Sequence, residues 1–90
     1  MSLKRWAAKR DQNEGEIVAA LRQVGAQVEI LSGKGVCDLL VLHRGRLFLL
    51  EIKTSSGRTT AAQQHRSRLG WPVIEARTVI EALHAIGVQI

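Results

Sequence analysis

The stretch most informative about the fold spans residues 36–53 and reads VCDLLVLHRGRLFLLEIK. It contains two strongly apolar runs, Val36 to His43 and Arg46 to Lys53, separated only by Arg44-Gly45. A two-residue connection that contains glycine is typical of a tight β-hairpin. Because both runs are almost continuously apolar, we expect two adjacent strands that are buried on both faces of a sheet.

Three charged residues interrupt these runs: Asp38 lies inside the first, and Glu51 and Lys53 end the second. If Arg44-Gly45 is the turn, the register places Asp38 directly opposite Glu51. Facing side chains project from the same face of a sheet, with Cβ atoms about 4.5–5.5 Å apart. Lys53 lies two residues beyond Glu51 and therefore projects from that face as well.

Opposed carboxylates repel each other across a sheet, and a divalent cation between them reverses the sign of that interaction. Mg²⁺ is held in proteins by one or two carboxylates and keeps several waters, which suits phosphodiester hydrolysis. Lys53 can stabilise charge in the transition state or orient the attacking water. The alternative is a salt bridge between Lys53 and one acid at a solvated strand end. It accounts less well for two acids and one base, because buried ion pairs are poor stabilisers.

The remaining pattern predicts a compact α/β domain with a mixed sheet in the order α-β-β-β-α-β-α, with helices on both faces. The first ten residues are expected to form a basic arm, and residues 11–90 a single domain. The other expected elements are a helix from Asp11 or Gln12 to about Val24, a short strand over Val28–Ile30, a helix from Thr59 or Thr60 to about Leu69, a strand over Trp71–Ala76, and a helix from Thr78 to about Ile86.

A third acid is expected on the first helix. At about 100° per residue, Glu14 lies roughly 60° from the centre of the apolar face, whereas Glu16 lies about 100° away on the other flank. Glu14 is thus the better candidate to face the sheet. A favourable charge in the first helical turn is nearly as good an explanation for Glu14, and the better one for Glu16.

Composition restricts the class of protein. The 90 residues are 46% hydrophobic, which is typical of a globular chain, and 13 Lys and Arg against 8 Asp and Glu give a net charge of +5. A basic surface attracts a polyanion such as nucleic acid, although it can also serve solubility alone. No apolar run is long enough to span a bilayer and the N-terminus has no signal core. With one cysteine, Cys37, we expect a reducing, cytoplasmic setting.

The motif residues resemble the PD-(D/E)XK nuclease superfamily and its restriction-endonuclease-like core. The matching segments are Asp38 in GVCDLLV (35–41), Glu51-Ile52-Lys53 after three apolar residues, and NEGEIV (13–18). More narrowly, the chain resembles the viral-type replication and repair nuclease (VRR-NUC) domain in its small, stand-alone phage or bacterial form. RTTAAQ (58–63) is similar to that family's turn into a glutamine-bearing helix.

This resemblance implies a Mg²⁺- or Mn²⁺-dependent DNA endonuclease in a bacterial or phage-infected cell. Asp38, Glu51 and the backbone carbonyl of Ile52 would bind the metal. Lys53 would be the catalytic lysine, with Glu14 as the helix acid and Gln63 as support. Small stand-alone members are associated with homodimers that resolve four-way (Holliday) junctions. The residues expected to contact DNA are Lys4, Arg5, Lys9, Arg10, Lys34, Arg58 and Arg66.

One residue departs from the family pattern. Cys37 stands where the family usually has proline before the metal-binding Asp38. The role of proline there is conformational, so we expect the chemistry to survive, with Cys37 as a small buried apolar residue. Trp6 can stack on a base or pack against the protein, and Trp71 is expected to pack at a strand start.

Two other functions compete with a nuclease. The first is a DNA-binding module of the same fold that does not cut, and the second is a small structural or regulatory partner of a larger assembly. A pure binder has no use for opposed carboxylates, and a structural partner leaves the charged strand ends unexplained. The sequence therefore favours an enzyme.

Overall fold

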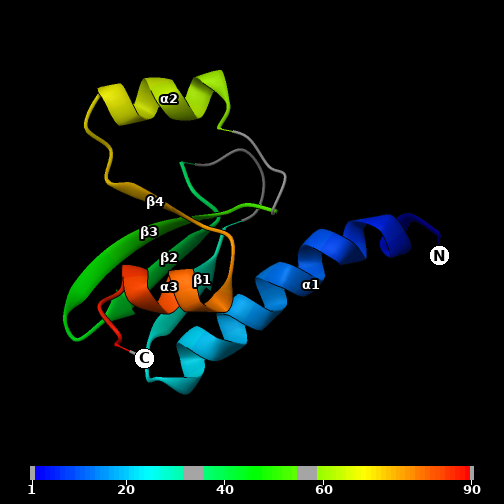
Figure 1. The fold of residues 1–90 in the computed structure, drawn as a ribbon, viewed down its shortest axis with the longest axis horizontal. Coiled ribbons are helices and arrows are strands. Elements are labelled where there is room, and N and C mark those ends of the chain that lie inside the picture. Colours follow the sequence, from blue (N-terminus) through cyan, green and yellow to red (C-terminus); the bar gives the residue numbers. More distant parts are fainter. Residues whose placement is uncertain (1, 32–35, 55–58, 90) are drawn as a thin grey trace.

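The computed structural model describes residues 2–31, 36–54 and 59–89, with side chains from Asn13 onward. Along the chain follow α1 (Ser2–Gln23), β1 (Gln27–Ile30), β2 (Leu39–His43), β3 (Arg46–Ile52), α2 (Ala61–Arg68), β4 (Val73–Ala76) and α3 (Val79–Ala85), as Figure 1 shows. The sheet order is β1-β2-β3-β4, with antiparallel pairs between the first three strands and β4 parallel to β3. The prediction of an α/β fold with a mixed sheet is confirmed.

The hairpin between β2 and β3 turns at the predicted dipeptide. Arg44 and Gly45 have φ angles of 52° and 76°, so both lie in the left-handed region that two-residue hairpin turns require. The pairing then runs from His43 opposite Arg46 to Leu39 opposite Leu50. This is the register deduced from the position of the turn.

Two glycines give a matched test of backbone energetics. Gly45 has a positive φ and Gly15 lies inside α1, and a Cβ added at either position meets no atom within 4 Å. We expect Gly45→Ala to lower the free energy of unfolding by about 1 kcal/mol, because alanine disfavours the left-handed region. Gly15→Ala should raise it by about 0.5–1 kcal/mol through helix propensity. Urea denaturation measures both, and changes of the same sign would contradict this account.

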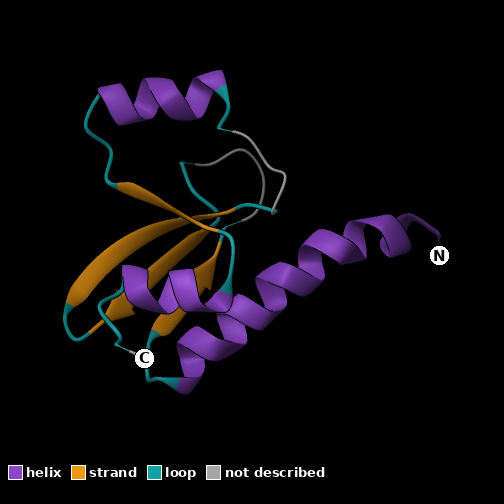
Figure 2. Cartoon of the chain, in the orientation of Figure 1, coloured by secondary structure: helices purple, strands orange, loops and turns teal. Residues whose placement is uncertain are grey.

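The hydrophobic core lies on one face of the sheet, where α1 and α3 pack (Figure 2). Its largest fully buried side chains come from α1 and from alternate strand positions: Ile17, Leu21, Leu39, Val41 and Leu50. On the other face, Leu42 is 40% and Leu47 is 61% exposed. The expectation that both strands are buried on both faces is therefore wrong. Helices α1 and α3 pack together on one face, and α2 buries no residue.

Three boundaries differ from those expected. Helix α1 begins at Ser2 rather than at Asp11 or Gln12, and its N-terminal half extends beyond the sheet (Figure 1). β2 begins at Leu39 and β4 at Val73, so Val36 and Trp71 precede these strands instead of belonging to them. None of the helices in the described ranges is long and apolar enough to cross a membrane.

Candidate metal and phosphodiester site

Asp38 lies just before β2 and is fastened to β3. Its backbone N–H donates to the carbonyl of Leu50 at 3.0 Å, and its carboxylate Oδ2 accepts from the N–H of Ile52 at 2.8 Å. The ladder ends at Leu39 opposite Leu50, and the N–H of Asp38 bonds to Leu50 rather than to Glu51, so Asp38 lies beyond the regular register. Asp38 and Glu51 both lie at the open end of the hairpin, where the charges of both act on Cys37, and their direct opposition stays a prediction.

Lys53 and Glu51 are joined through Gln63 of helix α2. The ammonium Nζ of Lys53 donates to Gln63 Oε1 at 2.6 Å, and Gln63 Nε2 donates to Glu51 Oε2 at 2.7 Å. Lys53 is only 8% exposed, the one charged residue among the buried side chains of the described chain. A buried cation needs such partners, since an unpaired charge is costly to desolvate. One amide thus fixes the positions of a base and an acid at the end of β3.

The same glutamine caps its own helix. Thr60 is the N-cap of α2, and its hydroxyl accepts from the N–H of Gln63 at 3.2 Å while Gln63 Oε1 accepts from the N–H of Thr60 at 2.9 Å. This reciprocal capping box satisfies two backbone donors that a helix start leaves unpaired. Because α2 buries none of its own residues, these polar contacts at its start are what attach it to the sheet. The structure therefore brings Gln63, which the family resemblance singles out, into direct contact with Lys53 and Glu51.

Cys37 is a buried neighbour of the two acids. Its side chain is 4% exposed and its Sγ donates to the carbonyl of Leu39 at 3.3 Å. Burial raises the pKa of the Cys37 thiol, and the negative charges of Glu51 and Asp38 raise it further. The thiol therefore remains protonated at neutral pH and is a poor metal ligand, because thiol ligands bind metals as thiolates. Its burial agrees with the packing role expected from the sequence.

Helix α1 contacts the C-terminal end of β3 through Asn13, the residue before Glu14. Asn13 Nδ2 donates to the backbone carbonyl of Lys53 at 3.4 Å, so this turn of α1 lies against the end of β3. Glu14 follows directly and is half-buried. Within the described residues, however, no three His, Cys, Asp or Glu side chains gather closely enough to hold a metal ion. Glu14, Asp38 and Glu51 are thus not assembled into a three-acid site here.

The donor set at the strand end nevertheless suits a hard cation. Asp38 and Glu51 offer carboxylate oxygens at the same end of the hairpin, and Mg²⁺ is commonly held by one or two carboxylates together with waters. Carboxylate oxygens are hard ligands, which suit Mg²⁺ or Mn²⁺ better than a soft metal that prefers sulfur. The residues present therefore fit Mg²⁺ or Mn²⁺.

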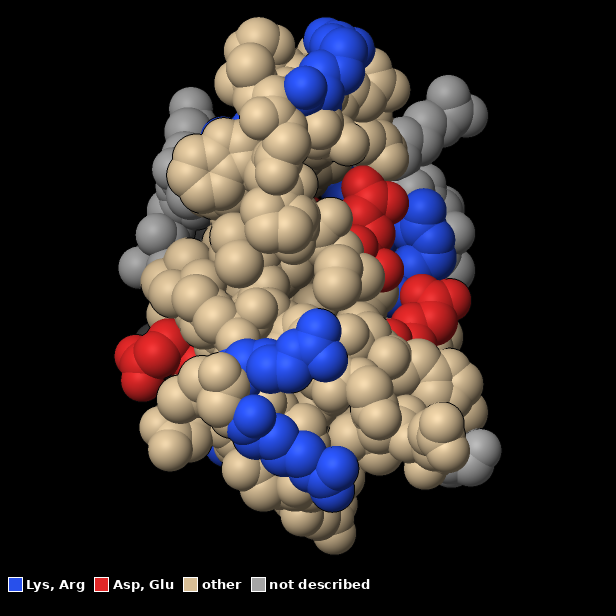
Figure 3. All heavy atoms as spheres, turned by 90° about the vertical axis from the view of Figure 1, so that its left-hand side faces the viewer, with Lys and Arg blue, Asp and Glu red and all other residues tan. Residues whose placement is uncertain are grey.

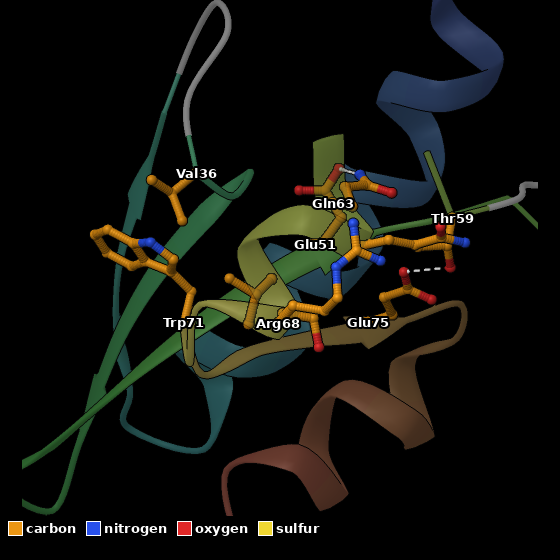
Figure 4. A pocket seen from close by; sticks show the side chains of 10 residues that line it. Val36, Glu51, Thr59, Gln63, Arg68, Trp71 and Glu75 are labelled. Atoms are coloured by element: carbon orange, nitrogen blue, oxygen red, sulfur yellow. Dashed lines mark hydrogen bonds between the residues drawn. The ribbon is translucent and has the colours of Figure 1, made fainter. Parts of the chain in front are cut away.

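Glu75 is a further acid at this site that the sequence did not reveal. It pairs with Glu51 across the parallel β3–β4 ladder, and both side chains line one pocket of about 480 Å³. Its Oε2 accepts from the hydroxyl of Thr59 at 2.9 Å, a contact drawn in Figure 4. The sequence did not reveal that Glu75 lies beside Glu51, because the register of a parallel strand pair depends on a crossover helix rather than on a short turn.

The residues expected to contact DNA are only partly described. Lys4, Arg5, Lys9 and Arg10 lie along α1, but their side chains are outside the described part, as are Lys34 and Arg58 altogether. Arg66 is half-buried on α2. On the face seen in Figure 3, Lys and Arg side chains lie in separate places rather than in one continuous patch. The structure does not gather the expected DNA contacts into a single described surface.

The described elements form three helices and a four-stranded mixed sheet. A solved structure described as "VRR_NUC domain" matches this chain with a TM-score of 0.66 and 21% identity, over 87% of this chain and 94% of that one. The chain therefore has the fold of a VRR_NUC domain, which confirms the fold that the sequence resemblance implied. No family model matches the chain, and neither does any curated protein.

Proposed function

We propose that this protein is a metal-dependent endonuclease that hydrolyses phosphodiester bonds in DNA. One observation carries the proposal: the Asp38 carboxylate accepts from the N–H of Ile52, and Gln63 links the residues on either side of Ile52, Glu51 and the buried Lys53. The match in fold to a VRR_NUC domain supports it independently. A module that only binds DNA gains nothing from paired acids, because they repel phosphate.

Each residue of the site has a distinct part in this proposal. Asp38, Glu51 and the carbonyl of Ile52 hold Mg²⁺ or Mn²⁺, with Glu14 approaching from α1. The cation, when bound, polarises a phosphoryl oxygen and acidifies a water. Lys53 places its ammonium group beside the scissile phosphate, where it stabilises the charge that develops as the bond breaks. Gln63 positions both Lys53 and Glu51.

The substrate in this proposal is branched DNA such as a four-way junction, and the acting form is a homodimer. Two copies related by a two-fold axis present two sites, which suits paired cuts on a symmetric junction. Positive side chains would hold the phosphates flanking the cut. The residues assigned to this task are Lys4, Arg5, Lys9, Arg10, Lys34, Arg58 and Arg66.

Metal dependence and substrate class are tested together. Labelled four-way junction, flap and linear duplex DNA are incubated with the protein and Mg²⁺, Mn²⁺ or EDTA, and products are resolved on a denaturing gel. We expect cutting of a branched substrate with either metal and none in EDTA, because Asp38 and Glu51 act through the cation.

Three outcomes would count against parts of the proposal. Cutting that persists in EDTA removes the metal mechanism. Equal cutting of the linear duplex removes the preference for branches. Binding without cutting under every condition supports the DNA-binding module instead, and sedimentation of the protein alone and on a junction tests the homodimer.

A further inference from the structure

A pocket of about 480 Å³ opens between α2 and the strand ends and shares Glu51 with the proposed site. Figure 4 shows its two sides. Trp71 and Val36 lie together on one side, while Arg68, Glu75 and Thr59 lie on the other. The pocket thus joins an apolar aromatic surface to a charged one, directly beside the proposed metal ligand.

The backbone of Trp71 is held by hydrogen bonds, whereas its side chain is partly exposed. It precedes β4, with its N–H donating to the carbonyl of Arg66 at 3.1 Å and its own carbonyl accepting from the N–H of Val73 at 2.9 Å. Gly70, with φ of 97°, makes the sharp exit from α2 just before it. The side chain nevertheless remains 47% exposed. Trp71 was expected to pack at a strand start; it lies two residues before β4 with about half of its side chain exposed, so a large aromatic surface lines the pocket.

The charges lining this pocket favour one part of a nucleic acid over another. Two carboxylates, Glu51 and Glu75, face a single guanidinium from Arg68. In the metal-free protein a phosphate inside the pocket would meet net repulsion, whereas a neutral ring with amino groups can donate to the carboxylate of Glu75. Arg68 can instead hold the phosphate attached to that nucleotide.

We propose that this pocket binds an unpaired nucleobase of the DNA strand being cut, stacked on Trp71 beside the scissile phosphate. The proposal rests on the nuclease function above and deepens it. Stacking on an aromatic ring tolerates any base, since every base has a π face. A base inside a duplex cannot reach Trp71 without leaving its stack, and unpaired bases at a branch make that step cheap. The pocket thereby favours branched over linear DNA.

Binding to two single-stranded probes tests the stacked base. One is an ordinary short oligonucleotide, and the other has the same length and charge but abasic sugars throughout; affinities are measured in EDTA so that no cutting occurs. We expect Trp71→Ala to weaken binding of the ordinary probe by about five- to 100-fold and to leave the abasic probe unchanged. Trp71→Phe should bind nearly as wild type does. Ile80→Ala, which removes an exposed apolar side chain on α3, is the control for surface truncation.

Two further measurements separate the base contact from a phosphate contact. Arg68→Ala should weaken both probes equally, because both retain their phosphates. In a Trp6→Phe chain Trp71 is the single tryptophan, and its fluorescence should be quenched by the ordinary probe alone. Equal binding of the two probes by wild type, or by wild type and Trp71→Ala, overturns the proposal. If either of these binding results is found while DNA is still cut, the base pocket is wrong and the nuclease proposal is unaffected. If the ordinary probe alone quenches Trp71 but no DNA is cut, the base pocket is supported and the nuclease proposal is wrong.

Discussion

Replacing Lys53 with alanine should lower the rate of metal-dependent DNA cutting by about 10²- to 10³-fold while DNA binding stays nearly unchanged. Lys53 is 8% exposed and its Nζ lies 2.6 Å from Gln63 Oε1, so the ammonium group is already positioned before substrate arrives. A donor fixed in advance stabilises transition-state charge without reorganisation. Single-turnover cutting with Mg²⁺ and binding in EDTA measure the two quantities separately.

Lys53→Arg and Gln63→Ala are the matched controls for this variant. Arginine keeps the charge but has a planar fork, so we expect activity between wild type and Lys53→Ala. Gln63→Ala keeps the ammonium group and removes its partner, which should reduce cutting less than loss of the charge does. Circular dichroism establishes that each variant is folded. Wild-type cutting rates in Lys53→Ala would exclude Lys53 from the chemistry.

The hairpin was predictable because its information is local. Arg44-Gly45 fixes the turn, and the turn fixes the register from His43 opposite Arg46 to Leu39 opposite Leu50, which brings Asp38 and Glu51 to the same end of the hairpin. Each step involves neighbours in sequence and a conformation that few residue types adopt. Similar local signals give Thr60 and Thr78 as the caps of α2 and α3.

What the sequence missed depends on long-range packing. The two apolar runs gave no sign that Leu42 and Leu47 are exposed. When both faces of a strand carry leucine, the sequence of a strand buried on one face looks the same as that of a strand buried on both. The start of α1 was placed too late, because the four basic residues among the first ten outweighed the helical spacing of Leu3, Trp6 and Ala7.

The site shows the same division. Asp38 and Glu51 follow from the hairpin, whereas the resemblance to a family was needed to single out Gln63, whose link to Lys53 spans a loop and a helix start. Glu75 reached the site through the parallel β3–β4 register, and Trp71 through the short exit from α2. Neither position carries a pattern in sequence, because both depend on where α2 places the chain.

Asp38→Asn should abolish cutting, with a loss of about 10²-fold or more, and should leave the metal-free protein at least as stable as wild type. Asparagine retains an oxygen that can accept from the N–H of Ile52, the bond Asp38 makes at 2.8 Å. It removes one of the two negative charges that act together on the buried Cys37. Function and stability therefore move in opposite directions, as expected where charges are kept for a ligand rather than for the fold.

Thermal unfolding in EDTA and in Mg²⁺ tests this separation directly. A cation that binds only the folded state stabilises it by about 2.7 kcal/mol at a concentration 100 times its dissociation constant. Wild type should therefore gain stability with Mg²⁺, and Asp38→Asn should gain little. Glu29→Gln, which neutralises an exposed acid on β1, should behave as wild type does. An equal gain in stability by wild type and Asp38→Asn would mean that the cation binds elsewhere. If neither Mg²⁺ nor Mn²⁺ stabilises the wild type, Asp38 and Glu51 do not bind a metal ion.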